Sequence, residues 1–303
     1  MISFSVRVPA SSANLGPGFD ALAVALGLYL TLDVEATGDD ECHMSGRPDL
    51  YGGQDLILTG LQAVAEAVGR PLPGCRTTAH SDIPVARGLG SSATALVAGL
   101  VAGNRLLGDP LTPADLLRLA TDFEGHGDNV SASLFGGITL TLDSDGHLVS
   151  RQVPIAAPLS TVAFVPDVIG LTRDARAVVP DEVPRGDAVA NLASCGLLVL
   201  ALTTGELPLL RAAMMDRLHQ PYRSTLFPHV PRLIAAAEDA GAYGASLSGA
   251  GPSVLALTDP RYAAAVAAAM DREARACATP GRSLVLEIAV SGAEVLAPVN
   301  QPV

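Results

Sequence analysis

The segment most able to do chemistry is a glycine- and serine-rich loop at residues 84–94, which leads into a stretch with helical spacing up to residue 107. Gly88 and Gly90 allow the backbone to turn tightly and to approach a ligand with no Cβ in the way. Ser91 or Ser92 can cap the helix that follows. Because a helix N-terminus presents free N–H groups and the positive end of its dipole, the loop predicts a phosphate-binding site.

The helix after this loop is rich in small residues, which predicts close packing against a neighbouring element. They are Ala93, Ala95, Ala98, Gly99, Ala102 and Gly103. An ordinary glycine-containing turn with a serine cap would explain the loop alone. The small residues, and further polar clusters along the chain, favour a binding site instead.

Composition narrows the chemistry. All 19 basic residues are arginines. The absence of lysine excludes a Walker A loop, which needs Gly-Lys-Ser/Thr, and any lysine Schiff base with pyridoxal phosphate. A phosphate would therefore be held by backbone N–H groups, serine hydroxyls, arginine and a metal ion.

Length, charge and cysteines bound the class of protein. A chain of 303 residues predicts two domains, and strands mixed with helices without strict alternation predict an α+β fold. The net charge of −12 argues against nucleic-acid and anionic membrane partners. The apolar segment 21–32 is too short to cross a bilayer. Four scattered cysteines predict reduced thiols in a cytoplasmic protein.

Spacing and end signals also predict individual elements. Helices are expected at 55–68, 113–123, 187–203, 230–240 and within 260–277, strands at 161–165, 253–257 and 283–290, and a polar turn at 9–20.

A second polar cluster lies at residues 124–129. Glu124 offers the hard oxygen ligand that Mg²⁺ prefers. His126 could donate to a carboxylate, Asp128 could orient an amine or accept a hydroxyl proton, and Asn129 could hold a hydroxyl group. A zinc site is disfavoured, since no second histidine lies four residues from His126. The alternative is a solvated helix end that stops at Gly125.

Three more polar clusters lie at residues 172–176, 219–223 and 246–253, and none of them by itself distinguishes a binding site from an ordinary loop. For residues 172–176 a charged surface turn is the default interpretation. The alternative is that Arg173 and Arg176, which would lie on neighbouring faces of a helix, clamp a carboxylate.

Taken in order, these motifs resemble the GHMP kinase superfamily, and within it the homoserine kinase family. The matching segments are PASSANLGPGFD at 9–20, PVARGLGSSAT at 84–94, EGHGDN at 124–129 with FGG at 135–137, DRLHQPYR at 216–223 and GASLSGAGP at 244–252. They span nearly the whole chain. The chain departs from the family pattern at Gly127, where the family has proline.

The resemblance implies an N-terminal ATP-binding domain over residues 1–155, similar to domain 2 of ribosomal protein S5, and a ferredoxin-like C-terminal domain over 156–303. It implies transfer of a phosphoryl group from ATP, with Mg²⁺, to the side-chain hydroxyl of L-homoserine in threonine biosynthesis. It also implies a homodimer.

The site residues carried over by position form three groups. The ATP loop comprises Pro84, Val85, Ala86, Arg87, Gly88, Leu89, Gly90, Ser91, Ser92, Ala93 and Thr94. Ser92 and Glu124 are the expected Mg²⁺ ligands, and Glu124, Asp128 and Asn129 the expected catalytic residues. The acceptor is expected to contact Asn14, Asp20, His126, Asp128, Asn129, Thr172, Arg176, Arg223 and Gly249. Either Asp128 acts as a base, or Asn129 positions the hydroxyl without one.

Two alternatives remain. One is another small-molecule kinase of the superfamily, such as a mevalonate or shikimate kinase. The second is a ligand-binding paralogue without activity. Arg176 and Arg223 favour an amino-acid acceptor, and the metal ligands favour an enzyme.

Overall fold

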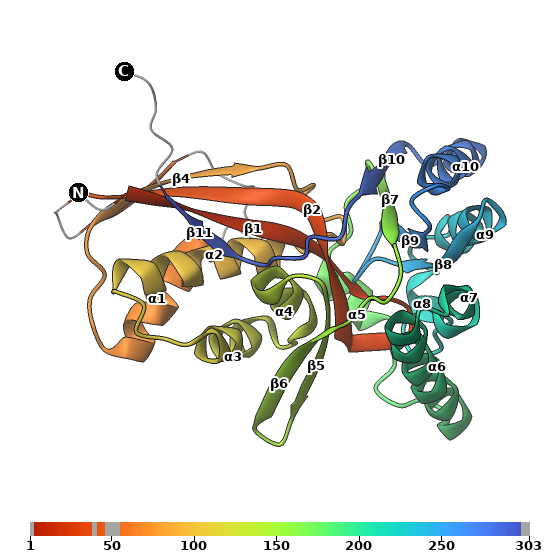
Figure 1. Cartoon of the computed structure of the whole chain (residues 1–303), viewed down its shortest axis with the longest axis horizontal. Coiled ribbons are helices and arrows are strands. Elements are labelled where there is room, and N and C mark those ends of the chain that lie inside the picture. The colour runs from red at the N-terminus through yellow and green to blue at the C-terminus, as the bar shows by residue number, and fades with distance from the viewer. Residues whose placement is uncertain (1–2, 38–40, 46–54, 298–303) are drawn as a thin grey trace.

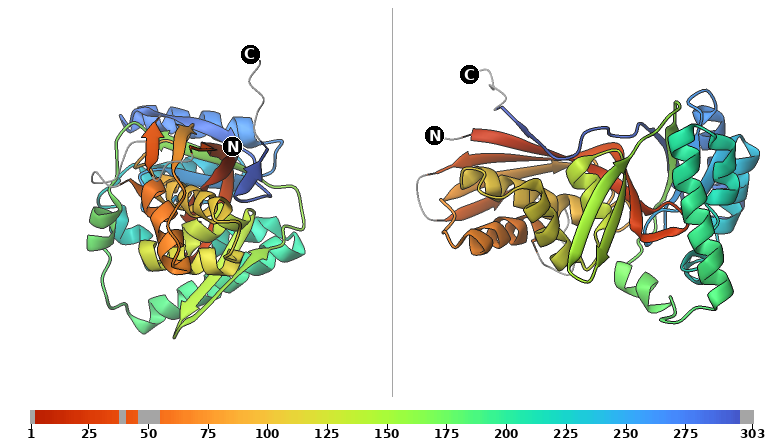
Figure 2. Two further views of the ribbon diagram at one scale, coloured as in Figure 1. Left: turned by 90° about the vertical axis from the view of Figure 1, so that its left-hand side faces the viewer. Right: turned by 60° about the horizontal axis from the view of Figure 1, so that its bottom comes forward.

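The computed structural model describes residues 3–37, 41–45 and 55–297, which form two α+β domains side by side (Figures 1 and 2). The first contains a seven-stranded sheet with the path β11-β1-β2-β4-β3, and the β5–β6 hairpin continues it from β2. Its strands are β1 (Ser3–Asn14), β2 (Gly18–Ala36), β3 (Cys42–Ser45), β4 (Cys75–Ser81), β5 (Ile138–Ser144), β6 (His147–Val153) and β11 (Glu294–Leu296).

Four helices cover one face of this sheet (Figure 1). They are α1 (Leu56–Val68), α2 (Ser91–Leu106), α3 (Pro113–Glu124) and α4 (Asp128–Phe135). The predicted ends of two of them are confirmed. Asp55 caps α1 and Gly69 ends it, while Thr112 and Asp115 form a capping box at α3.

The second domain contains a four-stranded antiparallel sheet in the order β10-β7-β9-β8. These strands are β7 (Ser160–Pro166), β8 (Ala242–Leu247), β9 (Val254–Thr258) and β10 (Gly281–Leu286). Numbered within this sheet alone, the order is 4-1-3-2, with α9 and α10 packed against the strands, which confirms the ferredoxin-like prediction. The helices of this domain are α5 (Thr172–Ala177), α6 (Arg185–Thr204), α7 (Leu210–Ala213), α8 (Gln220–Arg223), α9 (Val230–Asp239), α10 (Ala263–Ala276) and the 3₁₀ helix η1 (Leu207–Leu209).

Two local predictions need correction, and one helix was not predicted. Most of the expected polar turn at 9–20 is strand, because β1 and β2 pair almost to their ends and only residues 15–17 form the turn. The strand expected at 283–290 ends at Leu286. Residues 128–135, which carry no strong helical signal, form α4. The domain boundary at residue 155 stays a prediction, although β11 lies in the first sheet.

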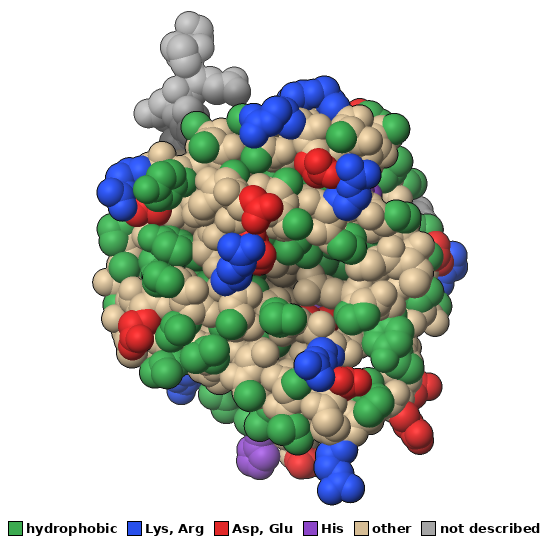
Figure 3. All heavy atoms as spheres, turned by 90° about the vertical axis from the view of Figure 1, so that its right-hand side faces the viewer, with side chains coloured by type: hydrophobic (Ala, Val, Ile, Leu, Met, Phe, Trp, Pro, Cys, Tyr) green, Lys and Arg blue, Asp and Glu red, His purple; other side chains and the backbone are tan. Residues whose placement is uncertain are grey.

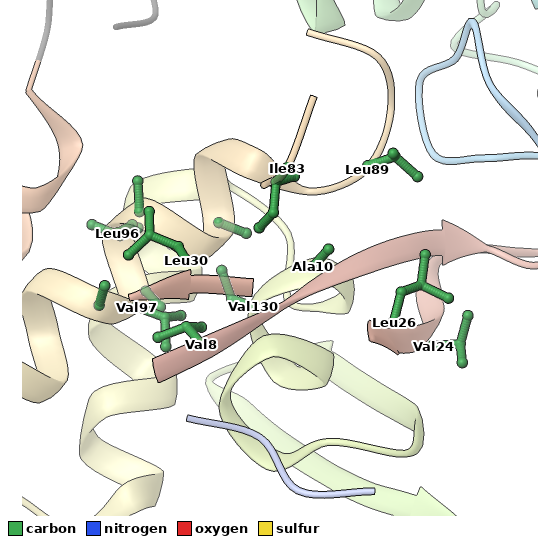
Figure 4. Packing of buried hydrophobic residues seen from close by; sticks show 14 of the residues in the cluster. Val8, Ala10, Val24, Leu26, Leu30, Ile83, Leu89, Leu96, Val97 and Val130 are labelled. Atoms are coloured by element: carbon green, nitrogen blue, oxygen red, sulfur yellow. The ribbon is translucent and has the colours of Figure 1, made fainter. Parts of the chain in front are cut away.

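The core of the first domain anchors the phosphate loop. Figure 4 shows Ile83, just before the loop, and Leu89, within it, among the buried residues that line β1, β2 and α2. Leu89 is buried to 1% exposure. The loop is therefore attached to the core by its apolar side chains.

Helices α1 and α2 approach closely because glycine lies at their contact. A Cβ added at Gly99 would lie 2.1 Å from the carbonyl oxygen of Ile57, and one at Gly60 would lie 2.5 Å from that of Leu96. The close packing predicted from the small residues of α2 is confirmed. It fixes the helix whose N-terminus carries the phosphate loop.

We expect Gly99→Ala to lower the free energy of unfolding by about 2 kcal/mol, because backbone atoms must move to admit the methyl group. The control is Gly186→Ala in α6, where an added Cβ meets nothing within 4 Å. This change should stabilise by at most about 1 kcal/mol through helix propensity. Urea unfolding of both variants measures the difference, and equal effects would contradict the close-packing argument.

Candidate active site

A cavity of about 340 Å³ lies where the two domains meet. Its walls come from the end of β1 and the start of β2, the phosphate loop with the start of α2, the junction of α3 and α4, and the second domain's α5, α8 and loop after β8. Segments far apart in the sequence therefore line one space.

The N-terminus of α2 forms one wall. Gly90, with a φ of 68°, precedes the helix as its N-cap, and Ser91, Ser92 and Ala93 form the first turn along the cavity. The prediction that a serine side chain caps this helix is wrong. The hydroxyl of Ser92 instead donates to Glu124 Oε1 over 2.5 Å, because the end of α3 brings this carboxylate against the loop.

The structure divides the eleven predicted loop residues into two groups. Six line the cavity: Ala86, Gly88, Gly90, Ser91, Ser92 and Ala93. The other five, Pro84, Val85, Arg87, Leu89 and Thr94, do not line it. The guanidinium of Arg87 donates to the carbonyl oxygens of Val85, Pro166 and Asp167, and thus ties the loop to the end of β7.

The second domain contacts the phosphate loop through Ser248. Its hydroxyl lies 2.6 Å from the carbonyl oxygen of Gly88 and 2.7 Å from the hydroxyl of Ser12. A Cβ at Gly88 would lie 2.3 Å from the carbonyl oxygen of Ser248. The backbone N–H of Gly170 also donates to the carbonyl oxygen of Ala86. The loop therefore lies between two domains, with glycine at the tightest contact.

A histidine–carboxylate pair forms the acidic wall. His126 Nδ1 lies 2.6 Å from Asp128 Oδ1, which also accepts the backbone N–H of Asn129. Burial alone would lower the pKa of His126, but the hydrogen bond and charge of Asp128, with the charge of Asp20, outweigh it and raise the pKa above its usual value. Asp20, His126 and Asp128 each place an atom within 4.8 Å of the others, so this wall favours a cation.

Two arginines face that wall. Arg176 in α5 donates through both terminal nitrogens to the two carboxylate oxygens of Asp20, at 2.8 and 3.1 Å. Arg223 in α8 is 2% exposed. Its burial, and the charge of Arg176, lower the pKa of Arg223 to about 10, so it stays charged at neutral pH. The site thus holds two cations whose planar forks match a carboxylate.

All nine residues predicted to contact the acceptor line the cavity, which does not by itself test their roles. Arg173 lies outside it, exposed beside Asp174. The departure from the family's proline at Gly127 has a steric explanation, because a Cβ there would lie 2.7 Å from Cγ2 of Thr141. The methyl group of Thr141 thus fills the space that a proline ring would need.

Sequence reasoning missed several lining residues: Leu56, Phe123, Gly170 and Ala250. It also missed Ser11, whose hydroxyl donates to Asn129 Oδ1 over 2.9 Å. Ser11 lies in the PASSAN motif, which was a usable signal. Ala250 lies in the GASLSGAGP motif, which was a usable signal too. Leu56 and Phe123 carried none, because an apolar side chain in a helix usually indicates core packing.

The class of protein follows from fold and family matches together. The GHMP kinases N terminal domain model matches residues 55–137, and the GHMP kinases C terminal model matches residues 198–276. Mevalonate kinase structures, at 14–18% identity and TM-scores of 0.68–0.70, share the fold. The fold and the site together define a two-domain GHMP kinase.

Relatives of higher identity narrow the class. The chain is 41% identical to a homoserine kinase of Moorella thermoacetica, over 90% of this chain and 94% of the relative, and 46% identical to one of Deinococcus radiodurans, over 85% of each. A crystal structure of homoserine kinase from Cytophaga hutchinsonii superposes with a TM-score of 0.86 at 31% identity, covering 97% of both chains. The chain belongs to the homoserine kinase family.

We expect Ser248→Ala to destabilise the protein by about 1–3 kcal/mol, because the partly buried Gly88 carbonyl and the buried Ser12 hydroxyl each lose a hydrogen-bond partner. Ser246→Ala is the matched control. Ser246 is equally buried, and its hydroxyl has no hydrogen-bond partner among the described residues. Its removal should be neutral or stabilising in urea unfolding. A Ser248→Ala variant as stable as Ser246→Ala would show that the Ser248 hydroxyl does not stabilise the contact between the two domains.

Proposed function

We propose that the protein transfers the γ-phosphoryl group of ATP to the side-chain hydroxyl of L-homoserine, giving O-phospho-L-homoserine and ADP. The observation that carries the proposal is the single cavity, in which a phosphate-type helix N-terminus meets an acidic wall and a pair of arginines. Membership of the homoserine kinase family supports the same acceptor. The product places the reaction in threonine biosynthesis.

The charged walls suit a zwitterionic amino acid. The carboxylate of homoserine would bind Arg176 and Arg223, since a guanidinium can donate hydrogen bonds to carboxylate oxygens. Its ammonium group would lie against Asp20 or Asp128. With the ammonium group on Asp20, the two ends of the acceptor would replace the interaction that Asp20 and Arg176 make with each other, so neither charge would be left unpaired.

The phosphate loop and its neighbours suit the donor. The first-turn N–H groups of α2 would bind phosphate oxygens. The Ser92 hydroxyl and the Glu124 carboxylate, which already touch, form a pair of hard oxygen donors suited to Mg²⁺. The ion would neutralise charge on the transferring phosphoryl group. Leu56 and Phe123 give the cavity its apolar surface.

The acceptor hydroxyl would lie between Asp128 and Asn129. Ser11 fixes the Asn129 side chain through Oδ1, which leaves its amide Nδ2 to donate to the hydroxyl oxygen. Asp128 is 1% exposed, with Oδ1 engaged by His126 and by backbone. As the hydroxyl oxygen attacks phosphorus, its proton would pass to Asp128 or to solvent. Positioning carries most of such a reaction, so both roles stay open.

The alternatives fit the walls less well. Mevalonate has no amine, and shikimate has none either, so either acceptor would leave Asp20 or Asp128 without its counter-charge. A paralogue that only binds ligand has no use for the Ser92–Glu124 pair.

The direct test measures ADP release with Mg·ATP and an acceptor panel of L-homoserine, L-threonine, mevalonate, shikimate and galactose. We expect strong turnover on L-homoserine alone. Turnover on a different acceptor would keep the kinase and overturn the assigned acceptor. ATP binding without turnover on any of them would identify a binding paralogue.

We expect Glu124→Gln to lower kcat at least about 100-fold while the KM for homoserine changes less than about threefold, because the carboxylate acts on the phosphoryl group in transfer. The control, Asp122→Asn, removes the same charge from the exposed side of α3 and should leave kcat unchanged. A variant with normal kcat and weakened homoserine binding would contradict the metal-ligand role.

We also propose that two copies associate through α6. Between residues 188 and 204 this helix carries no charge. Val189, Leu192 and Leu200 are 62%, 80% and 49% exposed. Water-exposed apolar residues at this helical spacing mark an interaction surface. Figure 3 shows that elsewhere on this end of the molecule charged side chains of both signs separate the hydrophobic ones.

The pattern along α6 favours a second copy as the partner. Around Gly196, where an added Cβ meets nothing within 4 Å, Leu192 and Leu200 are spaced symmetrically. Two antiparallel copies would therefore place Leu192 of each opposite Leu200 of the other. The same arrangement brings Arg185, before the stripe, toward Glu206, after it. The macrodipoles of the two α6 helices would also run antiparallel, which is the favourable arrangement for neighbouring helices.

The composition and exposure of α6 allow a second interpretation. Within the described ranges, α6 is the one helix long and apolar enough to cross a membrane, by length and composition alone. The net charge of −12 and four free thiols instead support a cytoplasmic protein without membrane or nucleic-acid partners.

Sedimentation velocity should show a dimer for the wild type and a monomer for Leu192→Asp, because the substitution buries an unpaired charge in the proposed contact. Val290→Asp, at an equally exposed apolar side chain away from α6, should remain dimeric. A monomeric wild type that co-sediments with lipid vesicles would replace the dimer by a membrane contact.

A further inference from the structure

Arg223 is held by an arrangement that the proposed reaction does not use directly. Its Nε donates to the carbonyl oxygen of Ala175 over 3.1 Å, and its Nη1 donates to that of Gly249 over 3.0 Å. Nη1 also lies 3.3 Å from Nδ1 of His219, one helical turn earlier. The guanidinium is thus fixed on one side, with its remaining donors available to the cavity that it lines.

His219 is fully buried, and its two ring nitrogens face different partners. Nε2 lies 2.8 Å from the carbonyl oxygen of Gly16, in the β1–β2 turn of the other domain. A carbonyl oxygen only accepts, so Nε2 carries the hydrogen. Arg223 only donates, so Nδ1 must carry the lone pair. These two partners select one neutral tautomer, and burial lowers the pKa of His219 in agreement.

Phe19 connects this histidine to both arginines. Its ring stacks on the His219 ring with centroids 5.1 Å apart and an interplanar angle of 18°. The guanidinium carbon of Arg223 lies 5.2 Å from the Phe19 centroid, and that of Arg176 lies 5.9 Å from it. An aromatic face attracts cations at these distances. One ring thus contacts two guanidiniums that repel each other.

Asp216 fixes the backbone that carries His219. Its two oxygens accept the backbone N–H groups of Leu218, His219 and Gln220, which fixes the start of α8. The carboxylate lies 3.6 Å from His219 Nε2. Because its oxygens accept backbone N–H groups, including that of His219, Asp216 fixes the position of the histidine without a hydrogen bond to either arginine.

We propose that Phe19 and His219 are positioning residues that hold Arg223, and through Phe19 also Arg176, in the geometry that receives the carboxylate of the acceptor. This inference rests on the proposed function, since it assumes an amino-acid acceptor. It adds two residues that touch neither substrate nor phosphate. Phe19 and Asp20 are adjacent at the start of β2, so this short segment of the first domain contacts both arginines of the second: the Phe19 ring contacts Arg176 and Arg223, and the Asp20 carboxylate pairs with Arg176.

Paired substitutions separate positioning from a merely structural role. Phe19→Leu keeps apolar bulk and removes the aromatic face, whereas Phe19→Tyr keeps the face. His219→Asn keeps an acceptor at the Nδ1 position toward Arg223, whereas His219→Gln keeps a donor at the Nε2 position toward Gly16. A structural role through Gly16 would be preserved by His219→Gln, and the positioning role by His219→Asn.

We expect Phe19→Leu and His219→Gln each to raise the KM for homoserine about tenfold, the scale of one cation–π contact or one charged hydrogen bond. The KM for Mg·ATP should change less than about twofold, because the phosphate loop is untouched. Phe19→Tyr and His219→Asn should restore most of the homoserine affinity. His229→Gln is the control, because this buried histidine is hydrogen-bonded to the carbonyl oxygen of Pro252 and its ring lies beside Phe227, not beside Phe19.

A second acceptor locates the effect. 3-Aminopropan-1-ol is homoserine without its carboxylate, so its kcat/KM or its inhibition constant should be the same in wild type, Phe19→Leu and His219→Gln. Equal losses for both acceptors would show general damage and overturn the proposal. So would normal homoserine KM in Phe19→Leu, or failure of His219→Asn with a normal His219→Gln. A wild type inactive on homoserine would overturn the proposed function as well, whereas an active wild type with unaffected variants would overturn this inference alone.

Discussion

The hydrogen bond from the buried Ser248 hydroxyl to the Gly88 carbonyl is the constraint on which the site depends. It joins the phosphate loop of one domain to the loop after β8 in the other, with a distance of 2.6 Å between the Ser248 hydroxyl and the Gly88 carbonyl oxygen. The approach is so close that Gly88 has no room for a Cβ. Because the loop is also attached to the first domain's core through Leu89, the donor site and the acceptor site are fixed relative to each other.

Electrostatics arranges the rest of the cavity. Two arginines and two carboxylates face each other across a small space: Asp20 pairs with Arg176, Asp128 pairs with His126, and Arg223 is held by backbone carbonyl oxygens. Charges that are already desolvated and oriented need little reorganisation when a zwitterion binds. The proposed reaction therefore depends on the rigid placement of charges more than on a strong base.

Close approach of backbones is a recurring device in this fold. Glycines at α1 and α2 let two helices meet, Gly88 lets the loop meet the second domain, and Gly127 admits the Thr141 side chain beside the acidic wall. In each case the missing side chain positions an element that carries functional groups. A substitution at these glycines would disturb the site from outside it.

The sequence by itself determined the local parts of this protein. Helix ends at Asp55, Gly69 and Thr112 follow from capping chemistry within a few residues. The α+β class and the motifs of the site were readable for the same reason, since each is a short run with its own physical signature. Only the tertiary structure decided which partners these residues take. Ser92 bonds to Glu124 instead of capping its helix, Arg87 faces β7 instead of phosphate, and Phe19 gathers two arginines from a distant part of the chain. Such contacts depend on distances between segments that are far apart in sequence, and no local pattern encodes those distances.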